Sequence, residues 1–176
     1  IIGCLNWFEE SPVWLAALVA SLAPFADHIV AGDGAYAAYP GANRCSRSGP
    51  EQADAIHRAA DAIGIGATVH VPHTPWYGGE VAKRSWLFQT AAMIAPEGWA
   101  YVIDADEIVS HAPADLRERL ADTDLDVAAI TLWWRDDLHA TALKAEAARQ
   151  VRYPQRGQNI GHRALFRLLP GLRCEG

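Results

Sequence analysis

Short apolar runs alternate with amphipathic segments along this chain, and the alternation predicts an α/β fold. The apolar runs predict strands at residues 1–5, 28–31, 68–71, 99–103, 127–134 and 163–169. The amphipathic segments predict helices that begin at Pro12 and Pro50, and further helices over 80–94, 113–120 and 138–150. Strands and helices that alternate in this way form βαβ units, so we expect a mostly parallel central sheet flanked by helices.

Length and charge narrow the class of protein. The 176 residues suit one domain, and a hydrophobic content of 51% is enough for a packed core. The net charge of −6 argues against a nucleic-acid partner, because a phosphate backbone is bound by clustered Lys and Arg side chains. A small anion held at one local site remains compatible with this charge.

The ends and the cysteines give further expectations. No apolar run reaches the roughly 18 residues of a membrane span, and the chain does not open with the basic and apolar pattern of a signal peptide. Cys4, Cys45 and Cys174 are far apart and odd in number, which predicts neither a zinc knuckle nor a disulfide framework. We therefore expect reduced thiols and a cytoplasmic location. Both ends look like cuts through a longer chain, so we expect part of the domain to lie beyond Gly176.

Polar side chains follow three of the predicted strands. Because parallel sheets bind ligands outside the carboxyl ends of their strands, these side chains should gather at one crevice. They are Asn6, Glu9 and Glu10 after the first strand, Asp33 after the second, and Asp104, Asp106 and Glu107 after the fourth.

The segment from Asp104 to Glu107 is the sharpest chemical feature. It places three carboxylates within four residues directly after an apolar strand. Such close like charges repel one another, and a divalent cation relieves this repulsion. Mg²⁺ and Mn²⁺ prefer oxygen ligands and share their shell with water and substrate phosphates. The alternative is a solvated acidic turn, or a carboxylate that caps the next helix.

Asp104-Ala105-Asp106 resembles the DxD motif of glycosyltransferases with the GT-A fold, and the order of the surrounding segments is similar to family 2 of these enzymes. Those enzymes begin with a strand, a turn containing Asn or Glu, and a helix with spaced leucines. They continue with a strand flanked by aspartates, a Gly and basic residues before the DxD strand, and a late stretch containing Phe-Arg. The matching positions here are 1–5, Asn6, Glu9, Leu15, Leu18, Leu22, 27–33, Gly79, Lys83, Arg84 and 164–171.

The resemblance covers nearly the whole chain and implies a fold and an activity. It implies one Rossmann-like GT-A domain over 1–176, with a nucleotide-binding half at 1–107 and an acceptor-side half at 108–176. The implied activity is metal-dependent transfer of a sugar from a UDP- or GDP-linked donor to an acceptor hydroxyl, with inversion. The implied cofactor is Mn²⁺ or Mg²⁺, whereas the acceptor, a glycan, lipid or protein, stays open.

The resemblance also implies roles for individual residues. Asp106 would be the main metal ligand, and Asp104 would lie near the ribose or a metal-bound water. Asp33 would contact the base or ribose, and Arg84 or Lys83 the base or the phosphates. The nucleotide-sugar set is completed by Asn6 and Glu9.

Other candidates come from position in the chain. Asp136 and Asp137 follow the fifth predicted strand and are candidates for the catalytic base, although they also suit a simple polar turn. Trp76 and Tyr77 lie in a loop near the binding edge and suit sugar or acceptor contacts, with core packing as the alternative for Trp76. Lys83 and Arg84 alternatively belong to the solvated face of a helix.

Two other functions compete with the transferase. A nucleotidyltransferase that makes a nucleotide-sugar also uses a Rossmann-like sheet and acidic metal ligands, but it needs a Gly-rich basic loop after the first strand. The segment 6–10 is Asn-Trp-Phe-Glu-Glu, which is not such a loop. The other alternative is a non-catalytic binding module with a GT-A-like fold. Metal-dependent nucleotide binding by the intact chain is the test that separates the transferase from this binding module.

Overall fold

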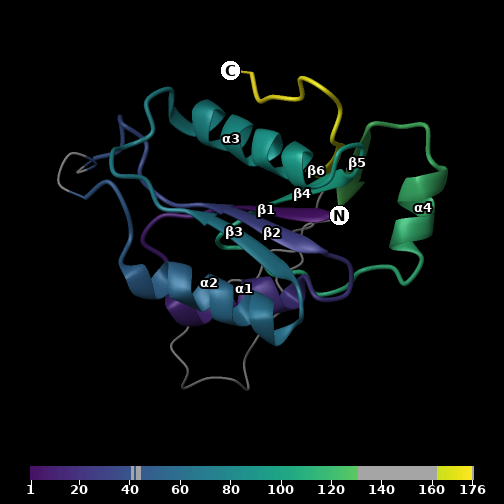
Figure 1. Cartoon of the computed structure of the whole chain (residues 1–176), viewed down its shortest axis with the longest axis horizontal. Coiled ribbons are helices and arrows are strands. Elements are labelled where there is room, and N and C mark those ends of the chain that lie inside the picture. The colour runs from purple at the N-terminus through teal and green to yellow at the C-terminus, as the bar shows by residue number, and fades with distance from the viewer. Residues whose placement is uncertain (41, 43–44, 131–161, 176) are drawn as a thin grey trace, which may run out of the picture.

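Six strands form one mixed sheet in the computed structural model, which describes residues 1–40, 42, 45–130 and 162–175. Helices cover both faces of this sheet (Figure 1). The elements in chain order are β1 (Ile2–Asn6), α1 (Pro12–Ser21), β2 (His28–Gly32), α2 (Pro50–Ala62), β3 (Gly66–His70), α3 (Gly79–Ile94), β4 (Trp99–Asp104), α4 (Leu116–Asp122), β5 (Val127–Ile130) and β6 (His162–Arg167).

The strand order is β3-β2-β1-β4-β6-β5. The first four of these strands are parallel, whereas β6 runs antiparallel to both of its neighbours. The predicted α/β class with helices on both faces is therefore confirmed, with an antiparallel edge added to the parallel part. The chain winds outward from β1 through β2 to β3 and then returns to β4 on the other side, so the winding reverses between β1 and β4.

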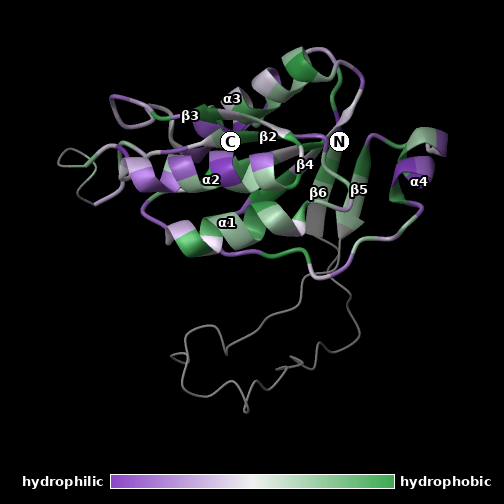
Figure 2. Ribbon diagram, turned by 60° about the horizontal axis from the view of Figure 1, so that its bottom comes forward, coloured by the Kyte–Doolittle hydropathy of each residue, from purple (hydrophilic) through white to green (hydrophobic). Residues whose placement is uncertain are grey.

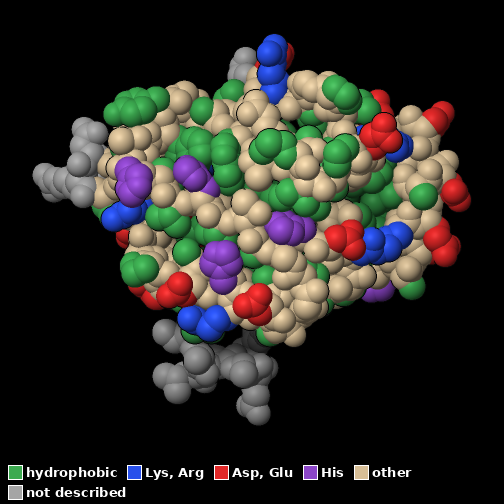
Figure 3. Space-filling view, in the orientation of Figure 1, with side chains coloured by type: hydrophobic (Ala, Val, Ile, Leu, Met, Phe, Trp, Pro, Cys, Tyr) green, Lys and Arg blue, Asp and Glu red, His purple; other side chains and the backbone are tan. Residues whose placement is uncertain are grey.

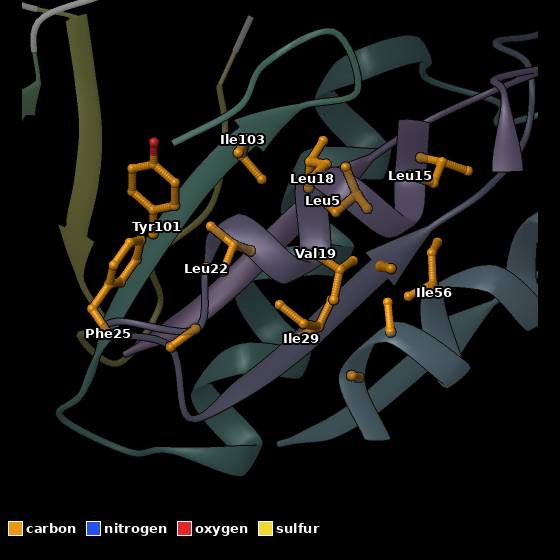
Figure 4. Close-up of a cluster of buried hydrophobic side chains, with 14 of the residues drawn as sticks. Leu5, Leu15, Leu18, Val19, Leu22, Phe25, Ile29, Ile56, Tyr101 and Ile103 are labelled. Atoms are coloured by element: carbon orange, nitrogen blue, oxygen red, sulfur yellow. The ribbon is translucent and has the colours of Figure 1, made fainter. Parts of the chain in front are cut away.

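The larger core lies between the sheet and the helix pair α1 and α2, which pack against each other. Ser11 occupies the N-cap of α1 and Pro12 its first turn, which explains where this helix begins. From there Leu15, Leu18 and Val19 are buried against the sheet (Figure 4). The rings of Phe25 and Tyr101 close one end of this core in an edge-on contact, with centroids 5.3 Å apart.

The other face of the sheet is covered by α3. Leu87, Phe88 and Ala91 of this helix pack on Ile2, Cys4, Val30, Ala100 and Val102. Burial raises the pKa of the Cys4 thiol to about 12, so this cysteine behaves as a small apolar side chain. In Figure 2 the strands are largely apolar, whereas α2 carries strongly hydrophilic positions.

Most predicted elements are present with shifts of one or two residues. The helix expected over 113–120 instead begins at Leu116, because Asp115 stands at its N-cap position and the residues from Pro113 form a preceding turn. The strand expected over 127–134 is seen as β5 up to Ile130, and its remainder lies outside the described residues. The predicted helix over 138–150 also lies outside them, as do Asp136 and Asp137.

Candidate functional site

A cavity of about 380 Å³ opens at the carboxyl ends of β1 and β4. Strand register explains its position, because Asn6 at the end of β1 is paired with Gly32 of β2 on one side and with Asp104 of β4 on the other. This is the point where the winding of the sheet reverses, which is where α/β proteins bind their ligands. The volume lies in the lower part of the range for small-molecule sites.

The structure brings together only part of the predicted site. Asn6, Lys83, Arg84, Asp104 and Asp106 line the cavity. By contrast, Glu9, Asp33, Trp76 and Tyr77 are not among its lining residues.

Asp33 is buried beside the crevice, with an exposed fraction of 1%. One carboxylate oxygen accepts a hydrogen bond from the Ser48 amide at 2.7 Å, and the other accepts from the Ser48 hydroxyl at 2.6 Å. The same Ser48 oxygen accepts from the Glu9 amide at 2.8 Å. Asp33 therefore ties the loop after β1 to the segment before α2, instead of presenting its carboxylate to the cavity as expected for a base or ribose contact.

Lys83 is also buried, with an exposed fraction of 1%, so the alternative of a solvated helix face is wrong for this residue. Its ammonium group donates to the carbonyl of Trp7 at 2.7 Å and to that of Gly34 at 2.8 Å. Burial lowers the pKa of Lys83 to about 7, and the nearby Asp33 carboxylate opposes this shift only in part. Lys83 thus joins the loops that follow β1 and β2 beneath the cavity.

Arg84, the next residue on α3, faces different partners. Its Nη2 lies 2.9 and 3.2 Å from the two carboxylate oxygens of Asp104, and its Nε lies 2.6 Å from Oε1 of Glu80. Burial disfavours the charged guanidinium, but the carboxylates of Asp104 and Glu80 outweigh this effect and raise the pKa of Arg84. Arg84 therefore carries its positive charge in the wall of the cavity.

The acidic turn after β4 is held in a defined shape. The indole N–H of Trp14 donates to the Ala105 carbonyl at 2.5 Å, and the Asp104 amide donates to the Glu107 carboxylate at 3.1 Å. Glu107 thus braces the turn through the Asp104 backbone, and it does not cap a helix, because the next helix, α4, begins only at Leu116. Asp106 is exposed at the cavity, and its carboxylate makes no hydrogen bond with the described part of the chain.

The chemistry of the donor set suits a hard divalent cation. Within the described ranges, no three His, Cys, Asp or Glu side chains are grouped closely enough to hold a metal by themselves. Mg²⁺ is nevertheless commonly bound through one or two carboxylates together with substrate phosphates and water. Asp104 and Asp106 provide such a pair at the cavity, so they fit a metal that arrives with a diphosphate.

Charge supports the same conclusion. Among the residues that the structure describes, the carboxylates of Glu10, Glu80, Asp104 and Asp106 line the cavity together with two basic groups, Lys83 and Arg84. A bare anion is repelled by such a lining, whereas a cation or a cation-bound anion is attracted. Elsewhere, on the described part of the face shown in Figure 3, Lys and Arg side chains lie apart from one another, most of them beside acidic ones.

Aromatic side chains from the loops after β1 and β2 line the cavity. Trp7, Phe8, Tyr36 and Tyr39 line it, and Phe8 meets Tyr39 edge-on with ring centroids 5.6 Å apart. The side-chain amide of Asn6 donates to the Tyr36 hydroxyl at 3.0 Å.

Trp76 and Tyr77, the two residues predicted to make sugar or acceptor contacts, do not line the cavity. Trp76 packs against His70 and Trp86 and donates its indole N–H to the Asp33 carbonyl, whereas Tyr77 is 74% exposed. Glu80 is a further charged residue of the cavity that sequence reasoning missed, although its spacing of four residues from Arg84 on one helix signals an ion pair.

Fold and site together define an α/β protein with an acidic, aromatic-walled crevice at the reversal point of its parallel strands. No known protein-family model matches this chain, and no curated protein sequence matches it significantly. Within the part of the chain that the structure describes, none of the helices combines the length and apolar character that a membrane crossing requires.

Proposed function

We propose that this chain is a metal-dependent glycosyltransferase with a GT-A fold, which transfers a sugar from a UDP- or GDP-linked donor to an acceptor hydroxyl with inversion. The observation that carries this proposal is the meeting of Asp104, Asp106 and Arg84 in one cavity at the reversal point of the sheet. Carboxylates for a hard cation and a guanidinium for phosphate oxygens are the complementary groups for a metal–diphosphate ligand.

In this proposal the lining residues have different roles. Asp106 and Asp104 would hold Mn²⁺ or Mg²⁺, which neutralises the charge that develops on the departing nucleoside diphosphate. Arg84 would pair with phosphate oxygens, and Tyr36 and Tyr39 would offer aromatic faces to the base or the sugar. Asp136 and Asp137 stay predictions for the catalytic base.

Direct titration tests this function. Isothermal calorimetry with UDP and GDP, each with and without Mn²⁺, should show binding that requires the metal. Asp106→Ala should abolish the metal dependence and leave the fold intact, because this exposed side chain makes no hydrogen bond with the described residues. Asp122→Ala, which removes an exposed carboxylate at the end of α4, should bind like the unaltered chain. Absence of metal-assisted binding by either nucleotide in the folded protein contradicts the proposal.

A further inference from the structure

Arg84 forms an ion pair with Asp104, one of the two proposed metal ligands. Its guanidinium contacts both oxygens of Asp104, and on its other side it is held by Glu80. The side chains of Arg84 and Asp104 are 21% and 40% exposed, so the pair forms part of the cavity surface. A ligand that enters the cavity therefore meets an ion pair that is already formed.

Both ends of this ion pair are fixed by their surroundings. Lys83, the residue before Arg84, is anchored on the Trp7 and Gly34 carbonyls and sets the position of this turn of α3. Asp104 is the last residue of β4, and its backbone amide donates to the Glu107 carboxylate. The contact can consequently be broken by rotation of the Arg84 side chain without displacement of either element.

A divalent cation and a guanidinium compete for the same carboxylate, since their like charges repel one another at this distance. A diphosphate removes this competition, because its oxygens offer the guanidinium a bidentate partner. We infer that Arg84 is the resident counter-ion of Asp104 and makes binding of the divalent cation conditional on the diphosphate. This inference rests on the proposed function and concerns the order and coupling of binding at the same site.

Coupling of this kind is reciprocal. If the diphosphate draws Arg84 away from Asp104 and so raises the affinity for the cation, the cation must raise the affinity for the diphosphate by the same factor. Typical couplings between ligands are about 5-fold to 150-fold. Arg84 acts here as a positioning residue whose removal should separate the two binding events.

Electron paramagnetic resonance of free Mn²⁺ tests the inference without any measurement of activity. Mn²⁺ is titrated into the chain alone and in the presence of UDP or GDP, and Mn²⁺ bound by nucleotide without protein is subtracted. Arg84→Met should bind Mn²⁺ alone at least about fivefold more tightly than the unaltered chain and should lose most of the gain that the nucleotide provides. Arg84→Lys, which keeps the charge but not the forked geometry, should lie between the two.

Arg119→Met is the matched control, because Arg119 of α4 pairs with Asp115, the residue before that helix, and its removal changes the net charge by the same amount. It should leave Mn²⁺ binding unchanged. A damaged fold cannot explain the expected result, since the variant gains affinity. Equal Mn²⁺ affinities of the unaltered chain and Arg84→Met without nucleotide, alongside metal-dependent nucleotide binding, overturn the inference and leave the proposed function standing. Absence of Mn²⁺ binding to every variant, with and without nucleotide, overturns both.

Discussion

Asp33 and Ser48 form a doubly hydrogen-bonded pair inside the protein, with the Ser48 amide and hydroxyl both donating to the Asp33 carboxylate. Fifteen positions separate the two residues in the chain, so the pair closes the long segment between β2 and α2. The Glu9 amide, which donates to the same Ser48 hydroxyl, extends the connection to the loop after β1. Both loops that border the cavity therefore depend on Ser48.

Ser48→Ala should lower the free energy of unfolding by about 1–3 kcal/mol, because one buried carboxylate oxygen of Asp33 loses its donor. Urea unfolding followed by circular dichroism measures this loss. Ser46→Ala is the control, since its hydroxyl donates to the His73 carbonyl at an exposed site and its removal should cost no more than about 0.5 kcal/mol. Equal losses in the two variants would show that the buried pair contributes nothing specific.

Lys83 predicts a pH dependence of stability. Its pKa is about 7 in the folded chain, against about 10.4 in an unfolded one, so between these values the unfolded state binds more protons. The contribution of Lys83 to the free energy of unfolding should therefore rise as pH increases from about 7 toward 10, by at most about 1.4 kcal/mol per pH unit. Lys83→Met removes the titrating group and should flatten that rise.

The measurement compares the free energies of unfolding of the unaltered chain and Lys83→Met at several pH values between 6.5 and 9.5. Their difference isolates Lys83, because the contributions of Cys4 and other titrating groups are shared by both proteins. Arg58→Met, which removes an exposed cation of α2, should give a difference that is constant with pH. A constant difference for Lys83→Met would contradict the lowered pKa.

Lys83 and Arg84 also show what sequence reasoning can and cannot supply. Both read as basic residues of one helix before the DxD-like strand, and that placement is correct. Successive residues of a helix point about 100° apart, so Lys83 is buried beneath the cavity whereas Arg84 is partly exposed in its wall. Which of them is buried depends on how α3 is rotated on the sheet, and that follows from the packing of Leu87 and Phe88 rather than from the charges.

The strands also show which features the sequence could predict and which it could not. The apolar runs predicted the ends of β1, β2 and β4 to within one residue, and parallel register brings Asn6 and Asp104 together at the crevice, but the runs did not show that Asp33 turns away from it. The direction of β6 was not predictable, since an apolar run reads alike in either direction. The sequence left Trp76 open between a binding contact and core packing for a similar reason, because only the contacts with His70 and Trp86 decide which way this loop aromatic points.

The aromatic wall of the cavity gives a prediction on binding. Tyr39 is 52% exposed and lines the cavity beside Phe8, so its ring is accessible to a base or sugar. Tyr39→Ala should weaken metal-dependent UDP or GDP binding, since loss of one base–aromatic stack costs about 1–3 kcal/mol. Tyr77→Ala is the matched control, because Tyr77 is more exposed and lies outside the cavity lining. Calorimetric titration in which both variants bind alike would remove Tyr39 from the site.

Gly34 lines the cavity, and its backbone conformation also bears on the stability of the fold. It has φ = 102°, and its carbonyl accepts one of the two hydrogen bonds of Lys83. A Cβ added there would lie 2.6 Å from Cγ of Pro72 and 2.8 Å from the carbonyl oxygen of Ser46, which is closer than such atoms can approach. Glycine is therefore required at this position both by conformation and by space.

Gly64 provides the matched comparison, because it also has positive φ, at 76°, but a Cβ added there would meet nothing within 4 Å. Gly64→Ala should cost only the conformational strain of about 1–2 kcal/mol. Gly34→Ala should cost about 1–3 kcal/mol more, since overpacking adds to the strain, and it should also weaken nucleotide binding by shifting the carbonyl that Lys83 holds. Chemical denaturation of both variants measures the difference, and equal losses would mean that the loop after β2 moves away from Pro72 at little cost.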